Sequence, residues 1–460
     1  MIDLSQTSQA CTRHTTRKRR RKKRLPKESV EATVESLSDE GRGIAHVDDR
    51  AVFIDHALAG ERVLFNYTRL TNKIAEGRAV EILDASTARV KPQCRAFGRC
   101  GGCSLQHMDT RAQIALKQET LLRQLKTIGH VEPANVLRPI TGKVWGYRSK
   151  ARLGVRYVEK KDRVLVGFRE RGSSFITETD VCDILHPDVG NVIAELADCI
   201  SLLEIKRLIP QIEVAAGDNQ TVLVFRHLEI MPAGDRDKLI ALAKKRGLVI
   251  MLQAGSPDDL ELLWPESADA LFYDLHDYNI RIEFEPADFT QVNNEVNRKM
   301  IRQAIDLLQP GKDDSVLDLF SGLGNFTLPL ARQCAQVTGI EGSQNMVNKA
   351  RANAERNGIV NASFHYADLY ADDIRHTQWI KRKYDRILLD PPRSGAAVVL
   401  QHIKRMHAKR IVYVSCHPAT LARDAGIIVN ELGYSLAHAG VMDMFPHTAH
   451  VESIAVFVKR

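Results

Sequence analysis

The chain has 460 residues, of which 44% are hydrophobic and 27% are charged. This length has room for roughly three domains, and the hydrophobic content supports sizeable cores, which excludes a globally disordered chain. No run approaches the ~18 consecutive apolar residues of a membrane helix, and no apolar segment follows the basic N-terminus as in a signal peptide. We therefore expect a cytoplasmic protein that does not enter a membrane.

The formal net charge of +8 is concentrated at the start of the chain. Residues 1–27 hold ten Lys or Arg against the single acid Asp3, and eight cations run without interruption from Arg17 to Arg24. Such a run repels itself, so we expect this basic arm to be disordered when free. An arm that contacts nucleic-acid phosphates is the favoured interpretation. A solvated or targeting segment is the alternative.

Residues 28–86 are predicted to form a small β domain. Short extended runs separated by turn residues occur at 30–34, 51–54, 61–68 and 77–83. Short strands that follow one another in fewer than sixty residues suggest a closed barrel of OB type, a fold that commonly binds nucleic acid, although a generic β domain is the alternative. The sequence of Asp39–Ala45 and Ala59–Glu61 resembles that of the TRAM domain, a small RNA-binding barrel.

Residues 87–285 are expected to be a mixed α+β middle domain, with a helix over 112–127 and strands over 148–156 and 164–168. This middle domain contains a cluster of cysteines. In a cytosolic chain of this size, clustered cysteines indicate a metal site or catalysis more often than disulfides. Four thiolates can bind either a zinc ion or a [4Fe–4S] cluster, and the spacing alone does not decide between them. The four cysteines are Cys94, Cys100, Cys103 and Cys182.

Residues 286–460 alternate between predicted strands and helices. One helix is predicted over 343–357 and is closed by Gly358, as a helix C-terminus often is. The alternation favours a Rossmann-like α/β domain with a parallel sheet, in which ligands bind beyond the carboxyl ends of the strands. Strands are predicted at 315–320, 337–341, 362–366, 386–389 and 410–415.

A Gly-x-Gly turn, Gly322 to Gly324, follows the first of these strands. Glu341 ends the next strand, where an acid can hold both hydroxyls of a ribose. The third glycine of the dinucleotide pattern is missing, which argues against a cofactor with a pyrophosphate. Because the third and fourth strands end near Asp368 and Asp390, we favour S-adenosylmethionine as the cofactor.

Cys416 follows the fifth strand and precedes a predicted helix. A helix N-terminus is expected to lower the pKa of a thiol, which favours a nucleophile over a buried structural cysteine. Addition of a thiolate to C6 of uracil would place electron density on C5, the carbon that then accepts a methyl group. A base must afterwards remove the C5 proton. Glu452 is the candidate, and a plain surface glutamate is the alternative.

Three segments resemble signature blocks of the RNA uracil-5 methyltransferases: Asp390–Arg393, Ser415–Asp424 and His447–Glu452. The family usually has asparagine where this chain has His417. The resemblance implies that Cys416 is the nucleophile and that Glu452 is the base. It also implies a cofactor site lined by Gln291, Phe320, Asn325, Glu341, Asp368 and Asp390.

The combination of barrel, four cysteines and methyltransferase domain resembles the subgroup that acts on 23S ribosomal RNA, across nearly the whole chain. That resemblance implies a [4Fe–4S] cluster, an OB-like TRAM barrel, an iron–sulfur middle domain and a Rossmann-like catalytic domain. It implies 23S ribosomal RNA as the partner, and we expect a monomer. Two enzyme alternatives stay open, a tRNA uracil-5 and an RNA cytosine-5 methyltransferase. The non-enzyme alternative is an RNA-binding ribosome assembly factor.

Overall fold

The computed structural model describes residues 25–71, 73–256 and 259–460, so most of the basic arm lies outside the described residues. The chain divides into two compact units. The first unit ends at residue 86, and the second contains residues 39–41 and 87–460. Within the described ranges, no helix combines the length and the apolar character needed to cross a membrane.

The described part of the first unit is one six-stranded sheet in the order β1-β5-β6-β4-β3-β2. β1 pairs with β5 and β2 pairs with β3, so two consecutive segments occupy the two ends of this order. Alternate side chains such as Val52, Ile54, Val63 and Phe65 are fully buried, as expected of a sheet with one covered face. The strands are β1 (Val30–Thr33), β2 (Ser36–Leu37), β3 (Gly43–Val47), β4 (Arg50–Asp55), β5 (Arg62–Leu70) and β6 (Ala75–Asp84).

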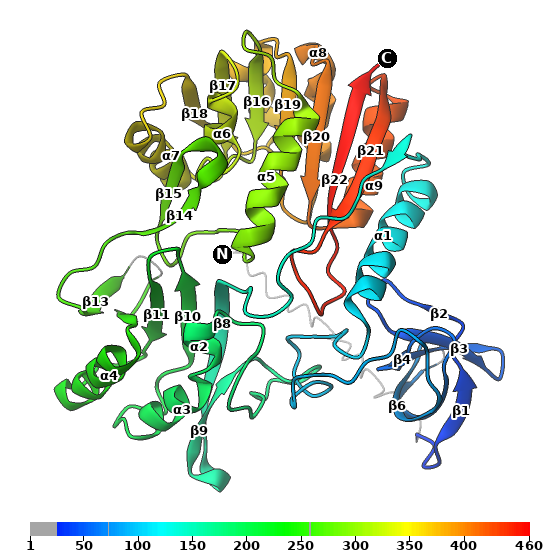
Figure 1. Ribbon diagram of the computed structural model, residues 1–460, viewed down its shortest axis with the longest axis vertical. Coiled ribbons are helices and arrows are strands. Elements are labelled where there is room, and N and C mark those ends of the chain that lie inside the picture. Colours follow the sequence, from blue (N-terminus) through cyan, green and yellow to red (C-terminus); the bar gives the residue numbers. More distant parts are fainter. Residues whose placement is uncertain (1–24, 72, 257–258) are drawn as a thin grey trace, which may run out of the picture. The chain divides into compact units, whose positions relative to one another are not determined.

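The second unit contains a mixed sheet of the order β13-β12-β11-β10-β8-β9 and a separate hairpin, β14-β15. Figure 1 shows α3 and α4 beside this sheet, and their apolar faces share one core with it. Both strands predicted here are present, as β8 and β9. The strands are β8 (Lys150–Val158), β9 (Arg163–Gly167), β10 (Gln211–Ala216), β11 (Thr221–Arg226), β12 (Val249–Gln253), β13 (Leu260–Trp264), β14 (Leu271–Leu275) and β15 (Ile280–Phe284). The helices are η1 (Glu159–Lys161), α2 (Pro187–Gly190), α3 (Ile193–Ser201), α4 (Ala233–Arg246) and η2 (His276–Tyr278).

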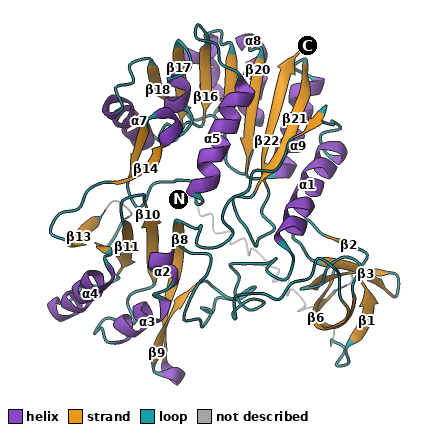
Figure 2. Cartoon of the chain, viewed as in Figure 1, coloured by secondary structure: helices purple, strands orange, loops and turns teal. Residues whose placement is uncertain are grey.

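The same unit contains an eight-stranded sheet in the order β18-β17-β16-β19-β20-β22-β21-β7. β16 to β20 are parallel, as predicted, and β22 runs antiparallel to β20. Helices cover both faces (Figure 2). The strands are β16 (Ser315–Leu319), β17 (Gln336–Glu341), β18 (Ala362–Tyr366), β19 (Arg386–Leu389), β20 (Arg410–Ser415), β21 (Tyr434–Met442) and β22 (Glu452–Lys459). The helices are α5 (Asn294–Leu308), α6 (Thr327–Ala331), α7 (Gln344–Arg356), η3 (Asp372–His376), η4 (Trp379–Lys381), α8 (Ala397–Met406) and α9 (Pro418–Asn430).

Two elements from the predicted middle domain complete this eight-stranded sheet. β7 (Asn135–Val136) pairs in parallel with β21 at the sheet edge. α1 (Thr110–Thr127) packs on α9 and β21, and Figure 1 shows it in cyan beside them. Leu121 and Leu125 of α1 belong to the same apolar core as β19 and β20. A segment that precedes β16 by some 200 residues of sequence therefore packs into the eight-stranded sheet.

The buried face of α1 also carries a charge. Lys117 is 1% exposed and its Nζ lies 2.7 Å from Oδ1 of Asp443, which is 3% exposed. The same Nζ donates to the carbonyl of Phe445 at 3.0 Å. Burial lowers the pKa of Lys117, and Asp443 opposes that shift. Since an unpaired buried charge is costly, this pair holds α1 to the segment that follows β21.

Replacing Lys117 with methionine leaves the carboxylate of Asp443 buried without its cation. We expect the free energy of unfolding to fall by about 3–5 kcal/mol, as for other broken buried pairs. Urea unfolding followed by circular dichroism measures the change. Lys126→Met is the matched control, because Lys126 is on the same helix and its pair with Glu132 is 68% and 66% exposed. Equal midpoints for the two variants would contradict the role of the buried pair.

Candidate active site

One cavity of about 600 Å³ lies where the parallel strands of the catalytic sheet end. The carboxyl ends of neighbouring parallel strands share one edge, so residues distant in sequence meet there. Every predicted catalytic and cofactor residue lines this cavity. They are Gln291, Phe320, Asn325, Glu341, Asp368, Asp390, Cys416 and Glu452.

The turn after β16 shapes one wall of the cavity. Gly322 has φ +54°, a conformation that favours glycine, and a Cβ there would meet no atom within 4 Å. The wall beside it is therefore open to a ligand. Glu341 accepts hydrogen bonds from the backbone N–H groups of Gly322 and Ser343, both at 3.0 Å. These two bonds fix its carboxylate between the turn and the start of α7.

Asp390 and the two prolines after it form the wall at the end of β19. Burial raises the pKa of Asp390 to about 7. The loop is held from behind by Asp424 of α9, which is fully buried and accepts from the backbone N–H of Ala396 at 2.7 Å and from the hydroxyl of Tyr413 at 2.6 Å. Tyr370, which also lines the cavity, donates to the carbonyl of Gly395 at 2.9 Å. The loop is thus fixed on both sides.

Cys416 lies between the end of β20 and the start of α9, as predicted. The expectation that the helix lowers its pKa is wrong. Burial raises the pKa of the Cys416 thiol to about 11, and Glu452 and Asp390 act in the same direction. Arg393 opposes them. Desolvation and two nearby carboxyls therefore outweigh the amides of the helix N-terminus.

Glu452 is the first residue of β22 and is 6% exposed, so it is not a surface glutamate. Burial raises its pKa to about 8, and Asp390 acts in the same direction. The positive charges of Arg393 and Lys117 oppose this shift. The cavity thus holds a buried carboxyl with a pKa of about 8 and a half-buried thiol.

Several residues that line the cavity were not assigned a place in it from the sequence. Arg393 directs Nη2 to within 3.4 Å of Nδ1 of His450, and both line the cavity. Phe289 also lines it and is 72% exposed. Arg393 and His450 lie in two of the signature blocks and Phe289 lies just before the predicted cofactor residue Gln291, so the neighbourhood of all three was visible in the sequence. The direction of their side chains was not.

Three cysteines of the predicted metal site lie in the loop before α1 and the fourth, Cys182, lies in the loop before α2, and none of the four is in a disulfide. Burial raises the pKa of Cys103 to about 12, and Cys182, Cys100 and Cys94 add to the shift, so the four thiols share one locality. In the described ranges, no three His, Cys, Asp or Glu side chains are arranged to hold a metal ion. The thiols are neighbours without a formed ligand geometry.

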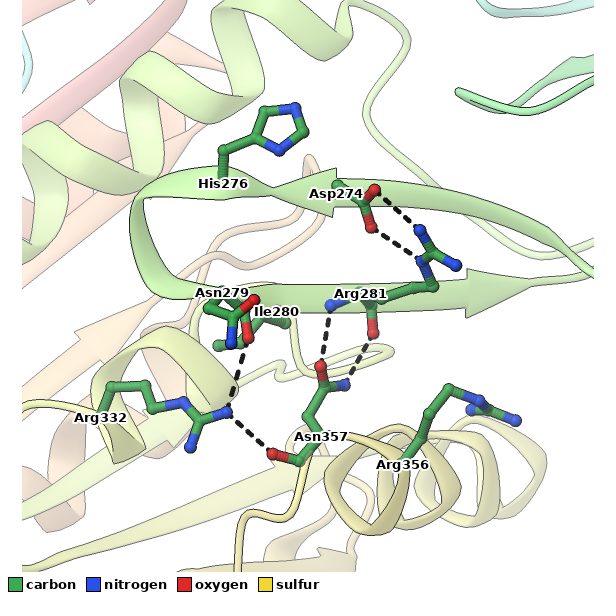
Figure 3. A pocket seen from close by; sticks show the side chains of 8 residues that line it. All are labelled: Asp274, His276, Asn279, Ile280, Arg281, Arg332, Arg356 and Asn357. Carbon is green, nitrogen blue, oxygen red and sulfur yellow. Dashed lines mark hydrogen bonds and ion pairs between the residues drawn. The ribbon is translucent and has the colours of Figure 1, made fainter.

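A second cavity, of about 420 Å³, lies between the β14–β15 hairpin and the end of α7 (Figure 3). It shares no lining residue with the first. Its arginines already bind protein acceptors: Arg281 makes two bonds to Asp274, and Arg332 donates to the carbonyl of Asn357. It contains neither a thiol nor a buried carboxyl, and the first cavity is the candidate active site.

Comparison with known proteins supports the same interpretation of the cavity as a methyltransferase site. The family described as tRNA (Uracil-5-)-methyltransferase matches residues 268–460, and the TRAM domain matches residues 23–80. Three relatives are named 23S rRNA (uracil(1939)-C(5))-methyltransferase RlmD. The Nitrosococcus oceani protein is 51% identical over 95% of this chain and 97% of its own length. The Methylococcus capsulatus protein is 52% identical over 95% of this chain and 98% of its own length. The Hahella chejuensis protein is 50% identical over 96% of this chain and 99% of its own length.

A solved structure, the Pyrococcus abyssi tRNA (uracil-54, C5)-methyltransferase in complex with S-adenosyl-L-homocysteine, shares the fold. It superposes with a TM-score of 0.73 at 22% identity and covers 93% of this chain and all of its own. The resemblance of the signature blocks to RNA uracil-5 methyltransferases, and of the N-terminal sequence to the TRAM domain, is confirmed. With half of its residues identical to the three relatives over nearly its full length, the chain belongs to the RNA (uracil-C5)-methyltransferase family.

Proposed function

We propose that the protein transfers the methyl group of S-adenosylmethionine to carbon 5 of a uridine in 23S ribosomal RNA. The observation that carries the proposal is one cavity in which a thiol and a buried carboxyl, Cys416 and Glu452, accompany the acids at the ends of three strands. The choice of RNA is supported by the relatives, whose names give uracil 1939 of 23S rRNA as their target. Such a substrate agrees with the expected cytoplasmic location.

The lining residues fit S-adenosylmethionine. A volume of about 600 Å³ falls in the range of ~300–1,000 Å³ that is usual for small-molecule sites. Glu341 stands where an acid can accept hydrogen bonds from ribose hydroxyls, and Gly322 leaves space beside it. Phe320 supplies an aromatic wall, with the ring of Tyr370 at 6.0 Å from its own. When bound, the cofactor supplies a methyl group that is electrophilic because it is attached to a sulfonium.

Cys416 is proposed to act first on the RNA. The thiol first loses its proton to water, the thiolate sulfur then forms a bond to C6 of the uracil, and the electron pair of the C5–C6 double bond moves toward C5 and O4. C5 then becomes nucleophilic enough to accept the methyl group. The positive charge of Arg393 opposes the rise in the pKa of Cys416 and therefore stabilises the thiolate. The target base would have to leave its stack, since C5 and C6 must be reached from opposite faces.

Glu452 is proposed to complete the reaction. After methyl transfer, C5 carries both a hydrogen and the new methyl group. The carboxylate removes the proton, the C–H electron pair restores the C5–C6 double bond, and the bond between C6 and the Cys416 sulfur breaks. A pKa of about 8 suits this role, because a general base works best when its pKa lies near the operating pH.

We further propose that Cys94, Cys100, Cys103 and Cys182 hold the [4Fe–4S] cluster of the subgroup. Four free thiols are the donor set that such a cluster needs. Each thiolate would raise the cost of ionising the next, as the pKa of Cys103 indicates, and a bound cation relieves that repulsion. None of the four lines the reaction cavity, which favours a structural role.

The product is expected to be 5-methyluridine, and Cys416→Ala should abolish its formation because the first bond cannot form. Cofactor binding, measured by calorimetry, should survive. The assay is methylation of 23S ribosomal RNA fragments with labelled cofactor, followed by nucleoside analysis. Cys199→Ala is the control, since Cys199 lies on α3 and does not line the cavity. Detection of 5-methylcytidine, or labelling of tRNA in a parallel reaction while the ribosomal fragments stay unlabelled, would refute the assignment.

Glu452→Gln should permit thiolate addition and methyl transfer but stall elimination, since an amide is not a useful base. A methylated protein–RNA adduct should accumulate as a shifted band on a denaturing gel. It should be absent from the Cys416→Ala, Glu452→Gln double variant. In the wild type, elimination should accelerate from about pH 6 and level off above about pH 8, because the unprotonated carboxylate is the active form. A variant that turns over normally would show that another group is the base.

Anaerobically purified protein should be brown and contain iron. Cys182→Ser should lose the metal, because three thiolates and one hydroxyl hold it poorly. Visible absorption and metal analysis give the readout, and Cys199→Ser serves as the control. Zinc bound in stoichiometric amount, without visible absorption, would exclude the cluster.

A further inference from the structure

The segment between β21 and β22, residues 443–451, delivers Glu452 to the cavity. It contains no regular secondary structure. His447 stands at its centre with φ +65°, is 4% exposed, and stacks on Trp145 at 3.9 Å between ring centroids. A buried residue in this strained region persists only when its surroundings hold it there. The question is therefore which groups hold His447.

The side chain of Gln113, on α1, is one of them. It is 1% exposed, and its Oε1 accepts from the backbone N–H of His447 at 2.9 Å. Its Nε2 donates to the carbonyls of Leu105 and Met108 at 3.0 and 2.8 Å. One amide group thus joins the segment before Glu452 to the turn that follows Cys103.

That turn binds the backbone carbonyl of the same residue, His447. The backbone N–H groups of Ser104 and Leu105 both donate to the carbonyl of His447 at 2.9 Å. The hydroxyl of Ser104 accepts from the N–H of Ala449 at 3.2 Å. The backbone of His447 therefore has its donor and its acceptor bound by residues of the cysteine loop and of α1, and not by its own sheet.

We infer that Gln113 is a positioning residue for proton removal, which holds the 443–451 segment against the turn after Cys103 and so fixes Glu452. The inference rests on the proposed function. It differs from a general structural role in the step that it affects. Thiolate addition depends on Cys416, which is held by β20 and α9, whereas elimination depends on the segment that Gln113 holds. Loss of the amide should slow the second step selectively.

Gln113→Ala and Ser104→Ala test this in single-turnover reactions of the full chain with labelled ribosomal RNA fragments. Adduct formation and adduct resolution are timed separately. For Gln113→Ala, formation should stay within about twofold of the wild type and resolution should slow on the order of ten- to a hundredfold, the effect of a displacement of roughly 1 Å in an active site. Ser104→Ala, which removes one bond, should show a smaller effect in the same direction.

Gln118→Ala is the matched control, since Gln118 is on the same helix and its Oε1 has no hydrogen-bond partner among the described residues. It should behave as the wild type. Equal slowing of both steps in Gln113→Ala, or unchanged resolution, would overturn the inference. A wild type that forms neither adduct nor 5-methyluridine would instead show that the proposed function is wrong.

If Gln113→Ala is less stable than the wild type, amide hydrogen exchange read by mass spectrometry distinguishes a local effect on positioning from a general loss of stability. Faster exchange confined to residues 104–108 and 443–451 is the expected result. Faster exchange throughout α1 and the catalytic sheet would mean that Gln113 only stabilises the fold, and the inference would fall.

Discussion

Three acidic groups, Cys416, Glu452 and Asp390, line one cavity, where Glu452 is buried and the other two are half-buried. Burial raises the pKa of each, to about 11, 8 and 7, and for Cys416 and Glu452 their neighbours add to the shift. Negative charge is costly there unless a cation accompanies it. Arg393 and Lys117 supply that positive charge from the protein. Because two such groups must act at near-neutral pH in the proposed reaction, the placement of these cations constrains the rest of the site.

The arrangement of the chain follows from that constraint. Lys117 is on α1, far from the catalytic segments in sequence, yet it is buried against Asp443 and acts on the pKa of Glu452. A buried ammonium is retained only with a partner. The pair with Asp443 therefore fixes the helix, and the helix in turn brings a positive charge to the base. Positioning and electrostatics are supplied by one side chain.

The sequence predicted the parts that depend on local patterns. The five parallel strands and helix α7 lie within one or two residues of their expected bounds, since buried β-strands and a capped helix leave clear signals. The residues at the strand ends meet as expected because parallel topology requires it. The raised pKa of Cys416 was not predicted, since a helix N-terminus is visible in sequence whereas desolvation is not. Lys117 and Gln113 left no signal either, because a polar residue on an amphipathic helix is normally assigned to solvent.

The contribution of α1 and β7 to the catalytic sheet was not predicted either, because it too depends on contacts that leave no local pattern in the sequence. A two-residue edge strand such as Asn135–Val136 is too short for any periodicity, and its place is set by pairing with β21. Once that pairing exists, α1 is held across α9, and its buried face can take polar residues whose partners come from the C-terminal segment. Such contacts are long-range in sequence and specific in geometry. They explain why the segment that contains α1 and β7, which the sequence assigned to a separate middle domain, packs as part of the catalytic domain.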